Sequence, residues 1–461
     1  MALRILHYSL GFPPYRSGGL TKYSVDLMWA QKEKGHQVIM MWPGKMNLTG
    51  HFVRFKRSKI TQKINREPVT FESIEMINPL PVPLDEGILE VDKFMEPCEN
   101  PEAFTEILRR IDPDAIHIHT FQGLYPELLI AAKELGIRTV FTTHDYFGIC
   151  PKITLFRDGD VCNGDCGKCA ACNKDALSIN KIKILQSSQY RRFKDSSLVK
   201  KLRKTHRDDF YQEDASLLEE EENTEKRFEK EDLSDEVYEE LRDFYRQFFK
   251  FIDVVHFNSS VTKEVFRRYL PPETKGKVIN ISNSDITDKR KIRGYGGKLR
   301  IAFPAAARDI KGYFMLKEAL DELWAEGIRD FELDVYSEPR NVSGYMKVLG
   351  AYKPSQIDQV YENADLLVAP SLCYETFGFT VLESLCYAVP ALVTTRVGAK
   401  DLLKEGHLGM IIQPTKEDLK QALLYIIKNR DILEVYNKRI YREFNFRDTR
   451  NSFDEVEKLY Q

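Results

Sequence analysis

The chain has 461 residues, of which 43% are hydrophobic and 30% are charged, with a formal net charge of -2. A single hydrophobic core rarely grows beyond roughly 250–300 residues, so this length predicts two domains. The nearly balanced charge argues against a nucleic-acid partner, and no apolar stretch approaches the ~20 residues that a membrane-spanning helix needs.

The first part of the sequence alternates short apolar runs with amphipathic segments. Runs at 5–9 and 38–42 flank a predicted helix over 21–34, which Gly35 closes. The rhythm continues with helices at 102–110 and 126–135 and with strands at 115–119, 139–143 and 253–257. Parallel strands need such helical crossovers, so we expect a doubly wound sheet. The amino terminus enters the first strand without signal-peptide features, which predicts a cytoplasmic protein.

Residues from about 150 to 250 break this rhythm and begin with clustered cysteines. Their C-x3-C-x2-C-x2-C spacing fits one tetrahedral structural zinc ion, with Cys150 as a substitute ligand. Free thiols or a labile disulfide remain open alternatives. An iron–sulfur cluster of the radical-enzyme type fits poorly, since several βα units precede the cluster. The candidate zinc ligands are Cys162, Cys166, Cys169 and Cys172.

A strongly charge-segregated stretch follows the cysteines. Residues 181–207 contain ten basic residues against one acid, and residues 213–240 are predominantly acidic. One interpretation is a helical hairpin whose opposite charges pair with each other or face water. The other is a basic surface for peripheral contact with an anionic membrane or a lipid pyrophosphate. The sequence leaves both open.

The second half restarts the alternation of strands and helices. Strands are predicted at 299–303, 331–336, 365–369 and 391–394, and helices at 313–326 and 380–386. We therefore expect two Rossmann-like domains that face a cleft, spanning 1–280, with the 150–250 insertion, and 281–445. Residues 446–461 are expected to form a helix that crosses back to the first domain.

Two charged motifs are predicted at the carboxyl edge of the second sheet. Residues 375–383 connect a strand to a helix, so backbone amides and the helix dipole would favour phosphate there. Glu375 and Glu383 could accept hydrogen bonds from sugar and ribose hydroxyls. Arg308 and Lys311 follow the first strand of this domain at the same edge. No D-x-D lies in a matching context, so these two cations could neutralise a departing diphosphate without a catalytic metal.

These motifs resemble those of the GT-B-fold retaining glycosyltransferases of glycosyltransferase family 4, also called glycosyl transferases group 1. Residues 375–383 match the family's E-x7-E signature, and residues 308–312 match its R-x-x-K-G pattern. Residues 14–19 resemble its amino-terminal glycine loop, and residues 35–38 fit the turn after its first helix. The resemblance spans both predicted domains.

The resemblance implies a role for each matching residue. Arg308 and Lys311 would hold the diphosphate, and Glu383 the ribose. The donor sugar would be bound by Glu375 with the loop residues Phe377, Gly378 and Phe379, and the phosphates would be approached by Gly18 and Gly19. A histidine is expected where His144 follows the strand at 139–143, and Asp145 and Tyr146 are acceptor-side candidates.

The expected function is metal-independent, retaining transfer of a sugar from a nucleotide sugar to a saccharide or lipid-linked saccharide. The resemblance places such transfer in cell-surface polysaccharide or glycoconjugate synthesis, in the cytoplasm or at the inner membrane face. Two alternatives remain open on the sequence alone. One is a nucleotide-sugar epimerase of the same architecture, and the other is a catalytically silent scaffold.

Overall fold

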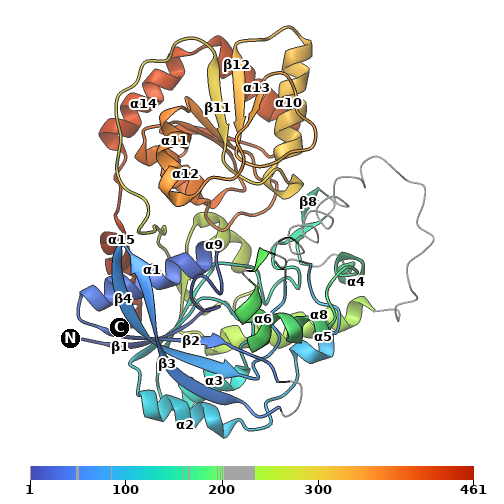
Figure 1. Ribbon diagram of the computed structural model, residues 1–461, viewed down its shortest axis with the longest axis vertical. Helices are drawn as coiled ribbons and strands as arrows, with labels where there is room; N and C mark the ends of the chain where they lie inside the picture. The colour runs from blue at the N-terminus through green and yellow to red at the C-terminus, as the bar shows by residue number, and fades with distance from the viewer. Residues whose placement is uncertain are drawn as a thin grey trace.

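The computed structural model describes residues 2–47, 51–84, 86–157, 159–164, 167–194, 196–197, 199, 201 and 234–461. These residues form two α/β domains, with the amino-terminal domain below and the carboxyl-terminal domain above in Figure 1. The expectation of two Rossmann-like domains, each with a doubly wound sheet, is confirmed.

The amino-terminal domain is built on an eight-stranded sheet with the order β10-β9-β6-β5-β1-β2-β4-β3. Central strands are buried on both faces, because helices cover each side of a parallel sheet. Helices α2 and α3 share one core with the sheet, and α1 packs on the opposite face. The elements are β1 (Arg4–Tyr8), β2 (Gln37–Pro43), β3 (Arg54–Ile64), β4 (Glu67–Ile77), β5 (Ala115–Ile118), β6 (Arg138–Thr142), β9 (Val254–Phe257), β10 (Lys275–Val278), α1 (Gly19–Glu33), α2 (Glu102–Ile111), α3 (Pro126–Glu134), α9 (Ser260–Phe266), η1 (Val91–Phe94) and η2 (Gln247–Phe251).

The hairpin of β3 and β4 was not predicted from the sequence. Its strands pair antiparallel along 11 residues each, around a turn in which Asn65 and Arg66 have positive φ. Strand β3 lies at the edge of the sheet, and most of its side chains are exposed. An edge strand whose side chains are mostly exposed carries little apolar periodicity, which explains why the pattern did not reveal it.

The carboxyl-terminal domain has a six-stranded sheet with the order β13-β12-β11-β14-β15-β16, parallel throughout. The chain leaves β11 toward one edge and then returns to β14 on its other side, so the strand order reverses between β11 and β14. Open α/β sheets bind ligands at such a switch point, beyond the carboxyl ends of the strands. The elements are β11 (Leu299–Phe303), β12 (Phe331–Val335), β13 (Met346–Val348), β14 (Leu366–Ala369), β15 (Ala391–Thr394), β16 (Gly409–Ile412), α10 (Tyr313–Ala325), α11 (Ile357–Glu362), α12 (Phe379–Cys386), α13 (Lys416–Lys428), α14 (Asp431–Glu443), η3 (Asp309–Lys311), η4 (Pro354–Gln356) and η5 (Gly398–Leu403).

The insertion between β6 and β9 is described in part. Its described helices pack beside the amino-terminal domain, and α8 shares that domain's core. Its short hairpin at 156–161 contacts the carboxyl-terminal domain instead, where Phe156 packs against the core and Asp160 pairs with Arg396. Residues 202–233, which hold most of the predicted acidic stretch, lie outside the described part. The described elements are β7 (Phe156–Arg157), β8 (Asp160–Val161), α4 (Cys169–Cys172), α5 (Ile179–Leu185), α6 (Ser188–Phe193) and α8 (Asp235–Arg246).

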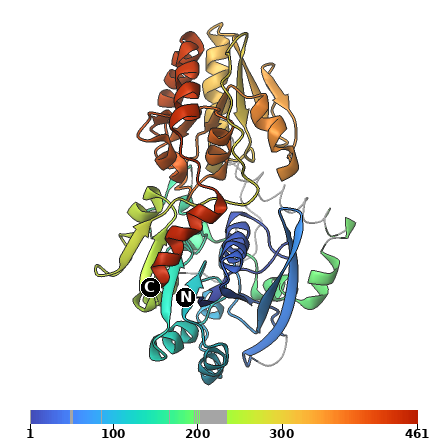
Figure 2. The same cartoon turned by 90° about the vertical axis from the view of Figure 1, so that its left-hand side faces the viewer.

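The last helix, α15 (Thr449–Glu457), lies against the amino-terminal domain, and the short η6 (Lys458–Tyr460) ends the chain. Figure 2 shows α15 beside α1, with the two chain ends close together. Phe453 of α15 and Tyr23 of α1 pack edge to face, with ring centroids 5.5 Å apart. The carboxyl terminus is therefore part of the amino-terminal domain's packing.

Among the described residues, no helix combines the length and apolar character that crossing a bilayer requires.

Candidate functional site

The loop between β14 and α12 is held rigidly against the segment that follows β15. Glu375 pairs with Val397 in an isolated parallel bridge, and its carbonyl accepts a hydrogen bond from the Gly398 N–H at 3.0 Å. A Cβ on Gly398 would lie 2.3 Å from the Thr376 carbonyl oxygen, so only glycine permits this approach. Gly378, with φ 100°, then caps α12. The local fold thus fixes Glu375 immediately before a helix amino terminus.

Glu375 is paired with Lys311, as Arg308–Gly312 lies at the same sheet edge. Lys311 Nζ is 2.6 Å from Glu375 Oε1, and the Ser371 hydroxyl donates to Oε2 at 2.6 Å. Burial alone would raise the pKa of Glu375, but Lys311 and the two hydrogen bonds hold it below its usual value. Burial opposes the charge on Lys311 too, yet Glu375 raises the pKa of Lys311. Both groups are therefore charged at neutral pH.

A cavity of about 220 Å³ lies beside this ion pair. It opens at the ends of β11 and β14, which is the switch point of the sheet. Besides Lys311 and Glu375, its lining residues are Phe303, Pro304, Ala305, Ala306, Val368, Ala369, Ser371 and Thr380. One cation, one carboxylate and the start of α12 therefore border a cavity where an anionic ligand is expected.

Arg308 and Gly312 frame the same turn. Arg308 is half-buried and precedes η3, and its carbonyl accepts hydrogen bonds from the N–H groups of Lys311 and Tyr313. Gly312 has φ 71°, and a Cβ there would lie 2.0 Å from the Pro370 carbonyl oxygen. Glycine is thus required at position 312, because the backbones of two loops beside the cavity approach each other closely there.

Glu383 lies on α12, one turn after the loop, and its carboxylate is held by a tyrosine. The Tyr361 hydroxyl donates to Glu383 Oε2 at 2.9 Å. Burial raises the pKa of Glu383 to about 7, although the hydrogen bonds from Tyr361 and Tyr352 lower it. This carboxyl therefore titrates near neutral pH.

The glycine loop of the other domain faces this helix. Gly18 has φ 116° and precedes α1, and nothing lies within 4 Å of the position of a Cβ there. A Cβ on Gly19 would lie 3.3 Å from the Phe379 ring. Phe379 in turn packs on the buried Phe377, with ring centroids 5.3 Å apart. The two predicted donor-binding loops, one from each domain, are thus neighbours.

His144 also lies at the junction of the domains. It follows β6, and its carbonyl accepts a hydrogen bond from the Thr376 hydroxyl at 3.2 Å. Its ring packs on Tyr23, with centroids 4.8 Å apart. Burial, followed by the charge of His256, lowers the pKa of His144 to about 3, so the imidazole is neutral. A neutral ring can donate one hydrogen bond and accept another.

The two acceptor-side candidates point into the amino-terminal domain. Asp145 Oδ2 accepts hydrogen bonds from Thr120 and Gln122, each at 2.8 Å, and Oδ1 accepts one from the Phe147 N–H at 3.0 Å. Burial raises the pKa of Asp145 to about 6 against these bonds. Tyr146 is 2% exposed and belongs to the core. Both side chains stabilise the turn that carries His144.

Three hydroxyl-bearing residues of the site were not singled out from the sequence. Ser371 and Tyr361 orient the two glutamates, whereas the Ser259 hydroxyl donates to the Thr376 carbonyl at 2.7 Å and joins the domains. Residues with hydroxyl groups are common, and the partners of these three lie 4 to 117 positions away. No local pattern could have identified them.

The cysteine candidates are placed incompletely, because Cys166 lies outside the described residues. Cys169 and Cys172 begin and end α4, and Cys162 follows β8. The buried Cys169 Sγ accepts a hydrogen bond from Arg242 Nη1 at 2.9 Å. Within the described part of the chain, three potential metal ligands converge at His7, His117 and His119.

Part of the basic stretch 181–207 serves the glycine loop. Arg191 Nη1 is 2.6 Å from Glu75 Oε1, and its guanidinium lies over the Tyr15 and Trp42 rings. Lys194 donates to the carbonyls of the 14–15 loop. These two cations are used within the domain, and the other described basic residues of the stretch lie on α5, α6 and at 201.

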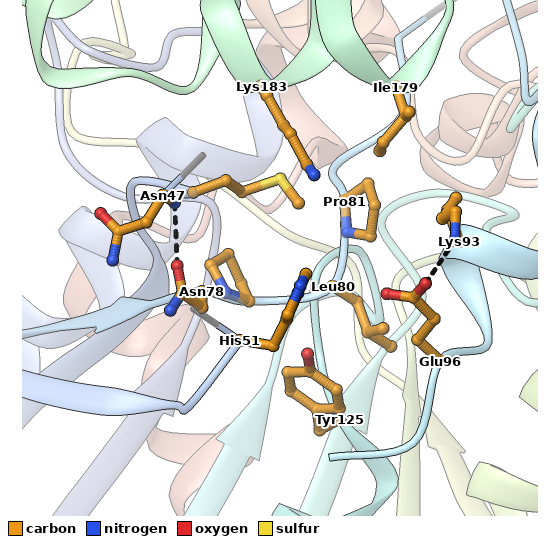
Figure 3. Close-up of a pocket in the computed structure, with 12 residues that line it drawn as sticks. Asn47, His51, Asn78, Leu80, Pro81, Lys93, Glu96, Tyr125, Ile179 and Lys183 are labelled. Atoms are coloured by element: carbon orange, nitrogen blue, oxygen red, sulfur yellow. Dashed lines mark hydrogen bonds and ion pairs between the residues drawn. The ribbon is translucent and has the colours of Figure 1, made fainter. Parts of the chain in front are cut away.

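A second cavity, of about 70 Å³, lies between α5 and the ends of β2 and β4 (Figure 3). Two pairs of its lining residues already interact with each other, as the Asn47 N–H donates to Asn78 Oδ1 at 2.9 Å and Lys93 donates to Glu96 at 2.6 Å. The cavity is less than a third the size of that beside Lys311. We therefore assign the chemistry to the larger cavity.

Comparisons with known proteins agree with this architecture. The family model "Glycosyl transferases group 1" matches residues 285–443, and "Glycosyltransferase Family 4" matches residues 17–159. A search of curated proteins found no match.

Solved structures share the fold along nearly the whole chain. Trehalose 6-phosphate synthase from Burkholderia multivorans is similar with a TM-score of 0.56 and 11% identity, over 100% of this chain and 96% of that one. A glycosyltransferase from Rickettsia africae has a TM-score of 0.55 and 13% identity, over 100% and 98%. HepE from Anabaena, in complex with UDP and glucose, has a TM-score of 0.52 and 14% identity, over 99% and 98%.

Proposed function

Because the chain belongs to the glycosyltransferases of group 1 and family 4, we propose that it transfers a sugar from a nucleotide-sugar donor, with retention and without a catalytic metal. The proposed acceptor is a saccharide or a lipid-linked saccharide. The observation that carries the proposal is the Lys311–Glu375 pair beside the cavity at the switch point. The complex of HepE with UDP and glucose supports a nucleotide sugar as the donor.

The charges around the cavity suit the departure of a diphosphate. As the bond between the anomeric carbon and the diphosphate breaks, negative charge grows on the leaving oxygen. Lys311 and Arg308 would stabilise that charge, as would the N–H groups at the start of α12. The carboxylate of Glu375, already oriented by Lys311 and Ser371, would accept hydrogen bonds from sugar hydroxyls.

The proposed step is a front-face displacement. The acceptor oxygen bonds to the anomeric carbon from the side that the diphosphate leaves, which preserves the configuration. The acceptor proton passes to the leaving phosphate oxygen, so no enzymic nucleophile is required.

Incubation of the purified protein with candidate nucleotide sugars and saccharide acceptors tests this proposal. Acceptor-dependent release of nucleoside diphosphate, with a product of retained configuration and undiminished rate in EDTA, is the expected result. An isomerised donor formed without acceptor would instead identify an epimerase, and loss of transfer in EDTA would reject metal independence. A thermal-shift panel of nucleotide sugars selects the donor beforehand, since a ligand of the folded state raises its stability.

We also propose peripheral contact with an anionic membrane through residues 181–207, where a lipid-linked acceptor would be met. Ile184 on α5 and Phe193 on α6 are 60% and 58% exposed, next to the exposed cations Lys181 and Arg192. Apolar side chains among basic ones are typical of interfacial helices. Glutamine at Lys181 and Arg192 should weaken cosedimentation with phosphatidylserine vesicles. Glutamine at the exposed Lys428 is a control, and equal loss in both variants would reject the surface.

A further inference from the structure

A continuous line of buried hydrogen bonds connects His144 to the carboxyl terminus. His144 Nε2 is 3.3 Å from His119 Nδ1, and His119 Nε2 is 3.1 Å from His7 Nδ1. His7 Nε2 is 2.7 Å from Gln31 Oε1, and Gln31 Nε2 donates to the Tyr460 hydroxyl at 2.8 Å. The line therefore runs from the domain junction, across β5 and β1, to α1 and η6.

A second arm begins at the same tyrosine. The Tyr460 hydroxyl is 2.7 Å from His117 Nδ1, and His117 Nε2 is 2.6 Å from Thr142 Oγ1. Thr142 Oγ1 is 2.9 Å from His256 Nδ1, and His256 Nε2 is 2.8 Å from the Ile279 carbonyl oxygen. The arm ends at an atom that can only accept a hydrogen bond.

The convergence of His7, His117 and His119 is explained by this line without a metal. Each of their ring nitrogens already has a hydrogen-bond partner within the protein. The three side chains are fully buried, and burial lowers the pKa of each, to about 4 for His7. The rings are therefore neutral, with one donor nitrogen and one acceptor nitrogen apiece.

The Ile279 carbonyl fixes the direction of the second arm. It accepts a hydrogen bond from the Nε2–H of His256. Burial lowers the pKa of His256 to about 4, so this ring is neutral too. His256 Nδ1 is therefore the acceptor, and the Thr142 hydroxyl donates to it. Thr142 Oγ1 can then only accept, from His117 Nε2. His117 Nδ1 in turn accepts from the Tyr460 hydroxyl, whose single proton is thereby used.

The direction then passes through Tyr460 to the first arm. With its proton committed, the Tyr460 oxygen accepts from the Gln31 amide nitrogen, so Gln31 Oε1 faces His7 and accepts from its Nε2. His7 Nδ1 then accepts from His119 Nε2, and His119 Nδ1 accepts from His144 Nε2. The reversed direction would set an unprotonated His256 Nε2 against the Ile279 carbonyl, two acceptors at 2.8 Å.

We propose that Gln31 and Tyr460 are positioning residues that hold His144 in its Nε2–H tautomer, leaving its Nδ1 as an acceptor only. The effect on catalysis rests on the proposed function: a sugar hydroxyl bound by His144 must then donate to it. Tyr460 thus determines which ring nitrogen of His144, at the domain junction, carries the proton.

Histidine tautomers in the full-length protein, labelled with ¹⁵N-histidine, test the proposal. In the wild type, all five network histidines should be protonated at Nε2. Gln31→Met removes the acceptor of His7, and a buried N–H without a partner is more costly than a buried lone pair. His7, His119 and His144 should therefore shift together toward the Nδ1–H form, while His117 and His256 keep theirs.

Tyr460→Phe provides a second variant that preserves packing. It frees the Gln31 amide to rotate, so the same three rings should become mixtures of tautomers. Tyr238→Phe is the matched control, since it removes a buried hydroxyl that donates to the Ile88 carbonyl at 2.7 Å, outside the network. A His144 that stays purely Nε2–H in both variants would overturn the proposal.

Measurements of sugar transfer distinguish a failure of the proposed hydrogen-bond network from a failure of the proposed function. Both variants should lower kcat/KM roughly two- to tenfold, because only part of the population keeps the competent tautomer. Shifted tautomers with unchanged transfer would overturn the role of His144 toward the substrate. A wild type without transferase activity would overturn the proposed function, and the tautomer result would remain an independent test of the hydrogen-bond network.

Discussion

Replacing Lys311 with methionine separates the structural part of the Lys311–Glu375 pair from its part in catalysis. The pair's atoms are 2.6 Å apart, and the side chains are 32% and 21% exposed. At an effective dielectric constant of about 20, the gross attraction is about 6 kcal/mol. Dehydration and solvent screening reduce the net value to about 1–3 kcal/mol. Lys311→Met should therefore lower the free energy of unfolding by about that amount, mainly because Glu375 loses its counter-ion.

Turnover should fall much further than stability. A preorganised charge at a departing oxygen contributes about 100- to 1,000-fold to the rate, which corresponds to about 2.7–4 kcal/mol. Urea denaturation measures stability, and acceptor-dependent release of nucleoside diphosphate measures turnover. Lys347→Met is the control, since Lys347 pairs with Glu332 on an exposed part of the same domain.

The double variant Lys311→Met/Glu375→Gln decides between the two roles. It removes both charges, so no carboxylate is left without a counter-ion, and most of the lost stability should return. Turnover should stay as low as in the single variant, because the leaving group still lacks the ammonium. Recovered turnover in the double variant would refute the proposed role of Lys311 at the diphosphate.

Three further predictions concern the backbone, pH and metal content. Gly312→Ala should destabilise the fold by about 1–3 kcal/mol more than Gly350→Ala in urea denaturation, because both have φ 71° but only the first collides with a carbonyl. Equal effects would show that the close approach is unimportant. Glu383 has a pKa of about 7 in the folded protein and of about 4.3 in the unfolded chain, so its protonated form favours the folded state. Its contribution to the free energy of unfolding should therefore be fully present below about pH 4.3 and be lost as the pH rises through 7. Glu383→Gln should flatten that pH profile, and an unchanged slope would contradict the assigned burial. If the cysteine cluster binds structural zinc, elemental analysis should find about one zinc per chain, lost in Cys162→Ser and kept in Cys98→Ser; a metal-free wild type would refute it.

The local features of the site were predictable from the sequence because they depend on short spacings. Gly312 and Gly378 have positive φ, and a turn that needs such a conformation shows itself as glycine at a fixed offset from a strand. Arg308, Lys311 and Glu375 follow predicted strands, so their common sheet edge could be inferred from the parallel topology. The two-domain α/β fold followed from the alternation of buried runs and amphipathic helices in the same way.

The antiparallel edge hairpin and the hydrogen-bond partners of Asp145 were not predictable in this way. Most side chains of β3 are exposed, so its sequence has little apolar signal. The expectation that Asp145 faces the acceptor stays a prediction. In the structure its carboxylate accepts hydrogen bonds from Thr120 and Gln122. Those partners precede it by more than 20 positions, which no local pattern relates.

By itself, the sequence determined the alternation of strands and helices, the glycine turns and the two charged motifs at 308–312 and 375–383, because each depends on neighbours within a few positions. Only the tertiary structure decided that Lys311 meets Glu375, 64 positions away, and that Tyr460 reaches His117 across 343 positions. Hydrogen bonds and ion pairs depend on distance in space, and packing of the two domains and the returning helix sets that distance. The sequence alone does not show which ring nitrogen of the five network histidines carries the proton. The Ile279 carbonyl decides this, because it accepts a hydrogen bond from His256 Nε2 and thereby orients the whole network.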